Sequence, residues 1–151
     1  MPKIQQMSSL KSFLREKNYK ALKMNSTETN HYECKVIING VEGSFIIDTG
    51  ASSSCIDFSY ADHFNLFSED SNIKAAGAGA TNMLTRASTN NKISIGKWTK
   101  KKVDLILFDL SHVNKALSDH DAELVHGIIG ADILKKGKAV IDYKTDYLYL
   151  K

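Results

Sequence analysis

Short apolar segments separated by turn-forming residues run through most of the chain, a pattern typical of β-strands. YECKVII and VEGSFII are joined by Asn39-Gly40, a dipeptide that supplies the positive φ angles of a type I′ hairpin turn. KISI is joined to Trp98 by Gly96-Lys97, which fits a type II′ turn, and VDLILF alternates as a further strand. AVIDY and YLYL flank the turn of a last hairpin. The pattern predicts a mostly β domain of short strands.

The N-terminal segment, residues 9–24, has a different pattern, because apolar side chains recur there at helical intervals: Leu10, Phe13, Leu14 and Leu22. Ser8 or Ser9 is the candidate N-cap of this helix. Residues 1–24 contain six Lys and Arg residues against one Glu, a net charge of +5, and the rest of the chain carries −2. A basic amphipathic helix packs on its own domain or binds a membrane or a partner, and these interpretations stay open.

The polar stretch NSTETN that follows predicts a linker. We therefore expect a basic amphipathic helix plus linker over residues 1–30 and one domain over residues 31–151. Two more helices are predicted inside that domain: a short one near residues 112–118, and ADILKK from Ala131, with Gly137 as its C-cap.

Composition restricts the classes of function. The 151 residues are 42% hydrophobic and 25% charged, as expected for a globular domain, and the net charge of +3 is too small to imply nucleic-acid binding. No stretch approaches the roughly 20 apolar residues of a membrane helix, and none resembles a signal peptide. Cys34 and Cys55 lack CxxC spacing, which favours free thiols in a reducing compartment, although a pairing between them stays open. These features predict a cytoplasmic protein.

The segment FIIDTGASSSC, residues 45–55, carries the first candidate chemistry. Its apolar start suits a strand buried on both faces, which would bring Asp48 to the interior, where a lone carboxylate is costly. Asp48-Thr49-Gly50 also fits a solvated turn, because Asp and Gly are turn formers. A second segment, HGIIGADIL, lies about eighty positions later and again places a glycine, Gly130, between a short apolar strand and a helix.

Together, FIIDTGA and GIIGADIL resemble the retropepsin-like aspartic proteases, and in particular stand-alone, bacterial-type members with a single domain. The resemblance covers roughly residues 31–151 and implies an acid-protease half-barrel with a flap hairpin over the substrate cleft. The stretch AAGAGATN lies where that family has its flap, so the resemblance assigns flap and substrate-binding roles to Ala76, Gly77, Ala78, Gly79 and Ala80. A phosphate loop is the alternative for this stretch, but GxxxxGK[ST] and GxGxxG are both absent.

The same resemblance implies that Asp48, Thr49 and Gly50 are the catalytic residues. Thr49 is expected to hydrogen-bond across a dimer, and Gly50 permits close approach of the backbone to the reacting water. Active-site support is assigned to Ala51, Ser52, Ile128, Ile129 and Gly130. Ser52 and Ala131 replace an Asp and an Arg that pair with each other in retroviral members, so both partners of that ion pair are absent together.

Hydrolysis by this chemistry requires two carboxylates around one water, and the chain contains no second Asp-Thr-Gly or Asp-Ser-Gly. The prediction is therefore a homodimeric aspartic endopeptidase with one Asp48 from each subunit, acting on an extended peptide at mildly acidic to near-neutral pH. The Asp-Thr-Gly loops are expected at the subunit interface. The terminal hairpin, with Tyr143, Tyr147 and Tyr149, either joins that interface or packs in the core.

Alternatives to this prediction remain. The same fold without turnover would be a dimerisation or peptide-binding module, and the basic N-terminal helix would act as a regulatory segment if it blocked the cleft. No cofactor and no metal are expected, because the histidines show no metal-ligand spacing; they stand at positions 31, 63, 112, 120 and 126.

Overall fold

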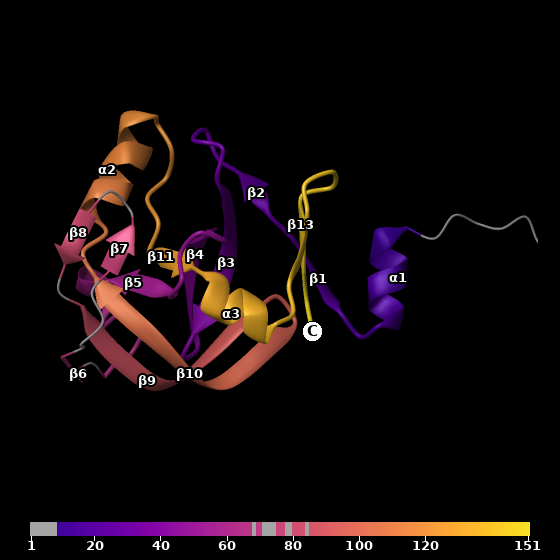
Figure 1. Ribbon diagram of the computed structural model, residues 1–151, viewed down its shortest axis with the longest axis horizontal. Coiled ribbons are helices and arrows are strands. Elements are labelled where there is room, and N and C mark those ends of the chain that lie inside the picture. The colour runs from indigo at the N-terminus through magenta and orange to yellow at the C-terminus, as the bar shows by residue number, and fades with distance from the viewer. Residues whose placement is uncertain (1–8, 68, 71–74, 78–79, 84) are drawn as a thin grey trace, which may run out of the picture.

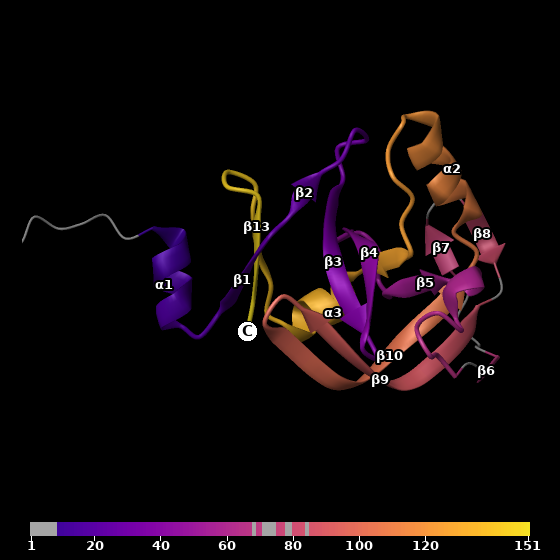
Figure 2. The same cartoon turned by 180° about the vertical axis from the view of Figure 1, so that it is seen from behind.

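The computed structural model describes residues 9–151 except 68, 71–74, 78–79 and 84, and its fold is mostly β, as the pattern predicted (Figure 1, Figure 2). The main sheet has eight strands in the order β2-β3-β4-β11-β5-β10-β9-β6, and a further pairing of β3 with β9 gives it a barrel-like shape. These strands are β2 (Asn25–Ser26), β3 (Tyr32–Ile38), β4 (Val41–Ile47), β5 (Cys55–Asp57), β6 (Glu69–Asp70), β9 (Arg86–Ile95), β10 (Trp98–Phe108) and β11 (Gly127–Ile129).

Two smaller sheets and a few short helices complete the described structure. The sheet strands are β1 (Lys20–Lys23), β13 (Tyr147–Leu150) and β12 (Val140–Asp142) in one sheet, and β7 (Ala75–Gly77) with β8 (Ala80–Met83) in the other. The helices are α1 (Leu10–Glu16), α2 (Ser111–Asp119), α3 (Ala131–Lys136) and the short 3₁₀ helix η1 (Phe58–Tyr60). The two helices predicted within the body are confirmed as α2 and α3, and α3 ends at the predicted C-cap, Gly137.

The predicted hairpins form at the predicted turns. Ile38 of β3 pairs with Val41 of β4, and between them Asn39 and Gly40 have φ angles of 50° and 85°, as a type I′ turn requires. Gly96 has a φ of 58° at the turn between β9 and β10, where glycine is favoured because it has no Cβ. The last hairpin joins β12 to β13.

Strand β4 is buried on both faces, as its apolar run predicted. Phe45 and Ile47 pack in the larger core, which lies inside the barrel-like sheet, while Ile46 packs in a smaller core on the opposite face. The smaller core is covered by α2, whose Leu117 is buried in it. Because β4 ends at Ile47, the next residue, Asp48, lies where the two cores meet the surface.

The N-terminal helix is much shorter than the predicted range of residues 9–24. Ser9 is its N-cap, as predicted, and accepts a hydrogen bond from Ser12 N, but α1 ends at Glu16. Asn18 then has a φ of 69°, which turns the chain into β1, where residues 20–23 pair with β13 instead of continuing the helix. The prediction failed because a long-range strand pairing, invisible in the local pattern, competed with helix formation.

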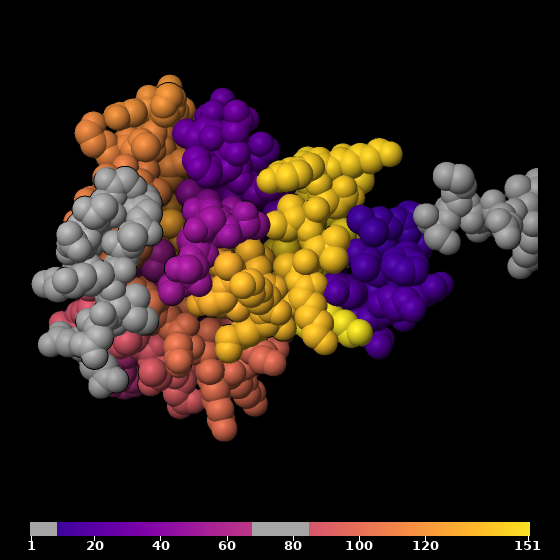
Figure 3. All heavy atoms as spheres, viewed as in Figure 1, coloured from indigo at the N-terminus to yellow at the C-terminus, as the bar shows by residue number. Residues whose placement is uncertain are grey.

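The N-terminal and C-terminal segments meet in one three-stranded sheet, β1-β13-β12. Figure 1 shows α1 beyond this sheet at one end of the molecule, whereas β7 and β8 lie at the other end. In the space-filling view the C-terminal hairpin separates α1 from the rest of the protein (Figure 3). No helix in the described part of the chain is long and apolar enough to cross a membrane.

Candidate active site

Asp48 begins the loop that follows β4. Its backbone N–H donates to the carbonyl oxygen of Ile129 (2.9 Å), and its carboxylate oxygen Oδ1 accepts from the N–H of Gly50 (2.8 Å). Ala51 N–H donates to the Asp48 carbonyl oxygen (3.2 Å), which closes a tight turn. Asp48 itself is half-buried, not interior as the buried strand led us to expect, and Thr49 and Gly50 are exposed. The turn therefore presents the carboxylate at the surface.

The second sequence segment runs directly beside the first. Strand β11 is parallel to β4 and places Ile128 opposite Ile46 and Ile129 opposite Ile47. A Cβ atom on Gly130 would lie 2.5 Å from the Ala51 carbonyl oxygen, closer than non-bonded atoms approach. Only glycine leaves room for the Asp48 loop at this position, and Ala131 N–H donates to the same Ala51 oxygen (2.7 Å).

A buried hydrogen-bond network that the sequence analysis missed joins the two segments. Ser54 is completely buried. Its hydroxyl donates to Asp132 Oδ1 (2.7 Å) and accepts from Gly130 N–H (2.8 Å). The same Asp132 oxygen also accepts from the N–H groups of Ser54 (2.9 Å) and Ile133 (2.8 Å). The one available signal was an acidic residue in the first turn of a helix, a position where carboxylates accept backbone hydrogen bonds.

The two positions that differ from retroviral members have different surroundings. Ser52 is exposed, while Ala131 is partly buried and holds the loop through its backbone N–H. In place of a charged pair, the Ser54–Asp132 network connects the Asp48 loop to α3. A carboxylate that accepts three short hydrogen bonds is well compensated for its partial burial.

The proposed flap residues fall partly within the described structure. Strands β7 and β8 pair antiparallel, with Ala75 opposite Met83 and Gly77 opposite Ala80. This two-stranded ribbon contains Ala76, Gly77 and Ala80, while Ala78 and Gly79 lie outside the described residues.

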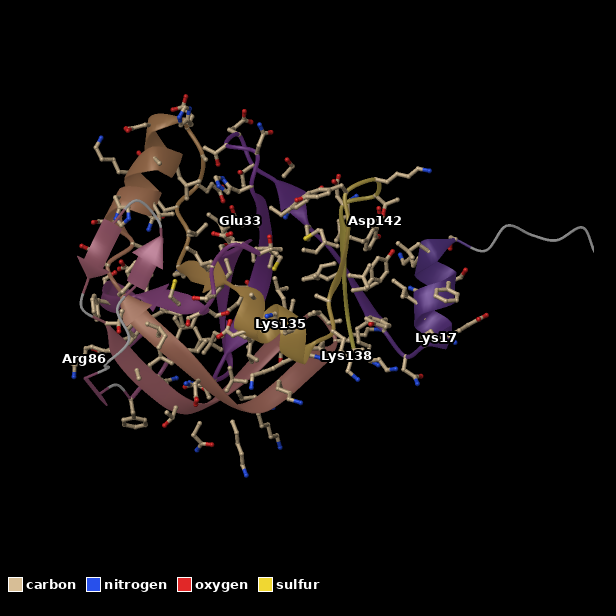
Figure 4. All side chains as sticks on the ribbon, in the orientation of Figure 1. Lys17, Glu33, Arg86, Lys135, Lys138 and Asp142 are labelled. Carbon is tan, nitrogen blue, oxygen red and sulfur yellow. The ribbon has the colours of Figure 1, made fainter. Side chains whose placement is uncertain are left out.

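Two pockets flank the Asp48 loop. One of about 240 Å³ is lined by Thr29, His31, Ile46, Asp48, His112, Val113, Ala116, Leu117 and Ile128. The other, of about 430 Å³, is lined by Thr49, Ala131, Leu134, Lys135, Lys138, Ala139 and Ile141. In Figure 4 Lys135 lies on α3 and Lys138 just beyond its end, beside the terminal sheet. Asp48 thus lines the first pocket, and Thr49 lines the second.

A histidine anchors the start of β11. The Nδ1 atom of His126 accepts from Ser44 N–H (3.0 Å), and its backbone N–H donates to the Ser44 carbonyl oxygen (2.9 Å). Burial, and to a lesser extent the nearby His63 and Lys35, lowers the pKa of His126 below its usual value. The imidazole is therefore kept neutral, the form that can accept the Ser44 hydrogen bond.

Cys34 and Cys55 are free and buried, and burial raises the pKa of each thiol to about 12, which leaves both unreactive. Within the described part of the chain, no three His, Cys, Asp or Glu side chains are placed to hold a metal ion.

Comparisons with known proteins agree with this geometry. Residues 34–133 match the model of a family described as aspartyl protease, which is 100 of the 151 residues. A search of curated proteins finds no match.

Solved structures with the same fold include a retropepsin-like aspartic protease from Rickettsia conorii, with a TM-score of 0.58 and 20% identity over 87% of this chain and 89% of that one. EIAV protease, complexed with the inhibitor HBY-793, has a TM-score of 0.54 and 19% identity over 73% of this chain and 90% of its own. The retroviral protease-like domain of Ddi1 from Leishmania major has a TM-score of 0.54 and 16% identity, covering 79% and 86%. The fold is therefore retropepsin-like.

Proposed function

The chain belongs to the aspartyl protease family, and from this premise we propose that it is an endopeptidase whose catalytic dyad consists of two Asp48 carboxylates, one from each subunit of a homodimer. The observation that carries the proposal is the accessible Asp48 carboxylate, held at the end of a buried strand by Gly50 and Ile129 and next to a pocket of about 240 Å³. An Asp used only as a turn former would need neither the pocket nor the close passage of Gly130.

The proposed chemistry uses a water between the two carboxylates. Two carboxylates at such short range cannot both ionise, so the pair holds one proton and titrates as a unit. The ionised member takes a proton from the water as the water oxygen bonds to the peptide carbonyl carbon, and the protonated member gives its proton to the carbonyl oxygen. When the tetrahedral intermediate collapses, the C–N bond breaks, the leaving nitrogen takes a proton from the pair, and a hydroxyl of the intermediate returns one to it. Because Ala51 offers no hydroxyl to favour the ionised form, we expect activity at mildly acidic to near-neutral pH.

The second carboxylate has to come from another copy of the chain, because the sequence has no second Asp-Thr-Gly or Asp-Ser-Gly. A twofold axis close to Asp48 would bring the exposed Thr49 of both subunits together, and the interface would be self-complementary. The terminal strands would meet the partner through β1 or β12, because β13 is paired on both edges within its own chain. Tyr149 is 1% exposed, which agrees with a core role for that part of the hairpin.

The β7–β8 ribbon would close over an extended peptide, which would bind through backbone hydrogen bonds as an added strand. The N-terminal helix α1 lies at the end of the molecule opposite this ribbon (Figure 1), which argues against its blocking the cleft of its own chain. The two buried free thiols fit the proposed cytoplasmic location.

The test is cleavage of a diverse peptide mixture between pH 3 and pH 8 over a series of protein concentrations. Wild type should cleave, with activity per chain falling on dilution, and Asp48→Asn should be inactive. Asp104→Asn removes an exposed carboxylate elsewhere and should behave as wild type. A folded dimer that cleaves nothing at any pH would instead support a peptide-binding module, and an active monomer would refute the shared dyad.

A further inference from the structure

A further pocket lies where α1 and β1 meet the turn between β9 and β10. Figure 1 and Figure 2 both show this turn beside the terminal sheet. The volume of the pocket, about 450 Å³, falls within the roughly 300–1,000 Å³ of sites that hold a whole small molecule. None of its residues lines either pocket of the Asp48 loop, so it is separate from the proposed active site. It is lined by Arg15, Tyr19, Lys20, Ala21, Gly96 and Lys97.

Half of these lining residues are cationic, and each of the three comes from a different element. Arg15 lies in the last turn of α1, Lys20 is the first residue of β1, and Lys97 lies in the turn that follows β9. No Asp or Glu is among the described residues that line the pocket. Three positive charges therefore converge on one pocket without an acidic group between them.

The three lining cations also differ from other lysines of the N-terminal segment, which already have partners. Lys11 Nζ donates to the hydroxyl of Tyr147 (3.2 Å), and Lys23 Nζ donates to the carbonyl oxygen of Thr145 (2.7 Å). By contrast, no ion pair or side-chain hydrogen bond joins any of the three lining cations to another residue in the described part of the chain. Their donors are left for a ligand.

The walls between the cations are held by the fold. Tyr19 donates through its hydroxyl to the Lys138 carbonyl oxygen (2.9 Å) and through its N–H to the Leu14 carbonyl oxygen (3.0 Å). A Cβ built on Gly96 would lie 3.4 Å from Leu22 Cδ1, so the turn packs directly on β1. The last carbonyl oxygens of α1 accept backbone hydrogen bonds from the residues that follow, which reduces their repulsion of an anion. Only the long cationic side chains have to be ordered when a ligand binds.

We propose that this pocket binds a small molecule that carries two or more phosphate groups. The forked donors of an Arg side chain match phosphate oxygens, and lysines add point charges, as in other phosphate sites. A ligand with several negative charges would offset the three cations that meet here. Because it would join α1 and β1 to the β9–β10 turn, it should stabilise the terminal sheet, β1-β13-β12. This inference does not depend on the proposed peptidase, since no residue of the Asp48 loop takes part.

The experiment measures the binding of inorganic tripolyphosphate to the full chain by isothermal titration calorimetry, with the ionic strength held constant by NaCl. Wild type should show saturable binding at one site per chain. The unfolding temperature should rise with tripolyphosphate concentration, because a ligand that binds only the folded state stabilises it. A folded wild-type protein that shows no saturable binding would overturn the proposal.

Variants test whether the pocket is the site. Arg15→Gln and Lys97→Gln should each weaken binding about tenfold, because each removes a charge-assisted contact. Arg15→Lys keeps the charge but not the forked donors, so its loss should be smaller than that of Arg15→Gln. Lys101→Gln removes a charge from an exposed position of β10 outside the pocket and should bind as wild type does. Equal weakening by Lys101→Gln and Lys97→Gln would show diffuse attraction to a basic surface and refute the site.

Discussion

The two sides of the Asp48 loop are built in different ways. On the α3 side, the backbone N–H and the hydroxyl of Ser54 donate to Asp132 (2.9 and 2.7 Å), and the Ser54 hydroxyl accepts from Gly130 N–H (2.8 Å). There is no space at Gly130 even for a methyl group. On the α2 side, the helix and Asp48 line a common pocket of about 240 Å³, and the buried Nε2 of His112 has no hydrogen-bond partner among the described residues. The first side is closed by hydrogen bonds and close backbone contact, whereas the second contains a pocket.

The largest effect should come from adding a side chain at Gly130, on the α3 side of the Asp48 loop. Gly130→Ala places a Cβ 2.5 Å from the backbone oxygen of Ala51, so the Asp48 loop must move. We expect a loss of about 3 kcal/mol in the free energy of unfolding and loss of peptidase activity, measured by urea denaturation and cleavage assay.

Gly137→Ala is the control for Gly130→Ala. A Cβ there would also lie close to a neighbour, at 2.7 Å, but that neighbour is Cδ2 of the Leu150 side chain, which can rotate away. Its cost should be clearly smaller and activity should remain. Equal losses for the two variants would mean that the Asp48 loop is not held by close backbone contact.

A smaller effect is expected from removing the buried hydroxyl that bridges the two segments. Ser54→Ala leaves Gly130 N–H without its acceptor and removes one of the donors to Asp132, at a cost of about 2 kcal/mol in unfolding free energy. The backbone bonds from Ser54 N–H to Asp132 and from Ala131 N–H to Ala51 remain, but the Asp48 loop is held less firmly against α3, so kcat should fall as well. Ser118→Ala, at an exposed position of α2, should match wild type in both measurements; a similar loss there would contradict the assignment.

The α2 side should respond in substrate binding more than in turnover. Asn114→Ala removes both hydrogen bonds to Val125, with an expected cost of about 1–2 kcal/mol in unfolding free energy. The released helix should raise KM for a cleaved peptide while kcat changes little, because the Asp48 loop is held from the other side. A drop in kcat at unchanged KM would show that α2 positions the dyad and not the substrate.

The smallest effect is expected in the pH dependence of stability, through His126 at the start of β11. The pKa of His126 is lowered in the folded protein, mainly by burial, so the native state favours the neutral imidazole. Its contribution to stability is complete above the ordinary pKa of about 6.5 and is lost as the pH falls through that value toward the folded pKa. Protonation also places a donor against the donating Ser44 N–H.

His126→Asn keeps an oxygen acceptor near Ser44 but cannot titrate in this range. Urea midpoints measured between pH 8 and pH 5 should therefore fall less for this variant than for wild type. His120→Asn, at an exposed position, should retain the wild-type pH dependence. Parallel midpoint curves for wild type and His126→Asn would show that another group accounts for the acid sensitivity.

Local pattern was enough for several parts of the fold. The Asn39-Gly40 turn, the double burial of β4 and the helix from Ala131 to Gly137 all follow from residues close together in sequence, because turn geometry and strand burial are short-range properties. The neighbouring Asp-Thr-Gly and Gly130 segments were also recognisable, since each carries its own glycine beside an apolar run.

Contacts between residues far apart in the chain could not be predicted from the local pattern. The pairing of β1 with β13 joins residues more than a hundred positions apart and ends α1 at Glu16, and the Ser54–Asp132 hydrogen bonds span 78 positions. Nothing in the local pattern brought α2 and Asp48 to one pocket. The Asp-Thr-Gly motif points to Asp48 as the carboxylate of the proposed chemistry, and the chain contains one copy of that motif. How that carboxylate is held, and which side of it is open to a substrate, depends on packing between segments that local preferences do not encode.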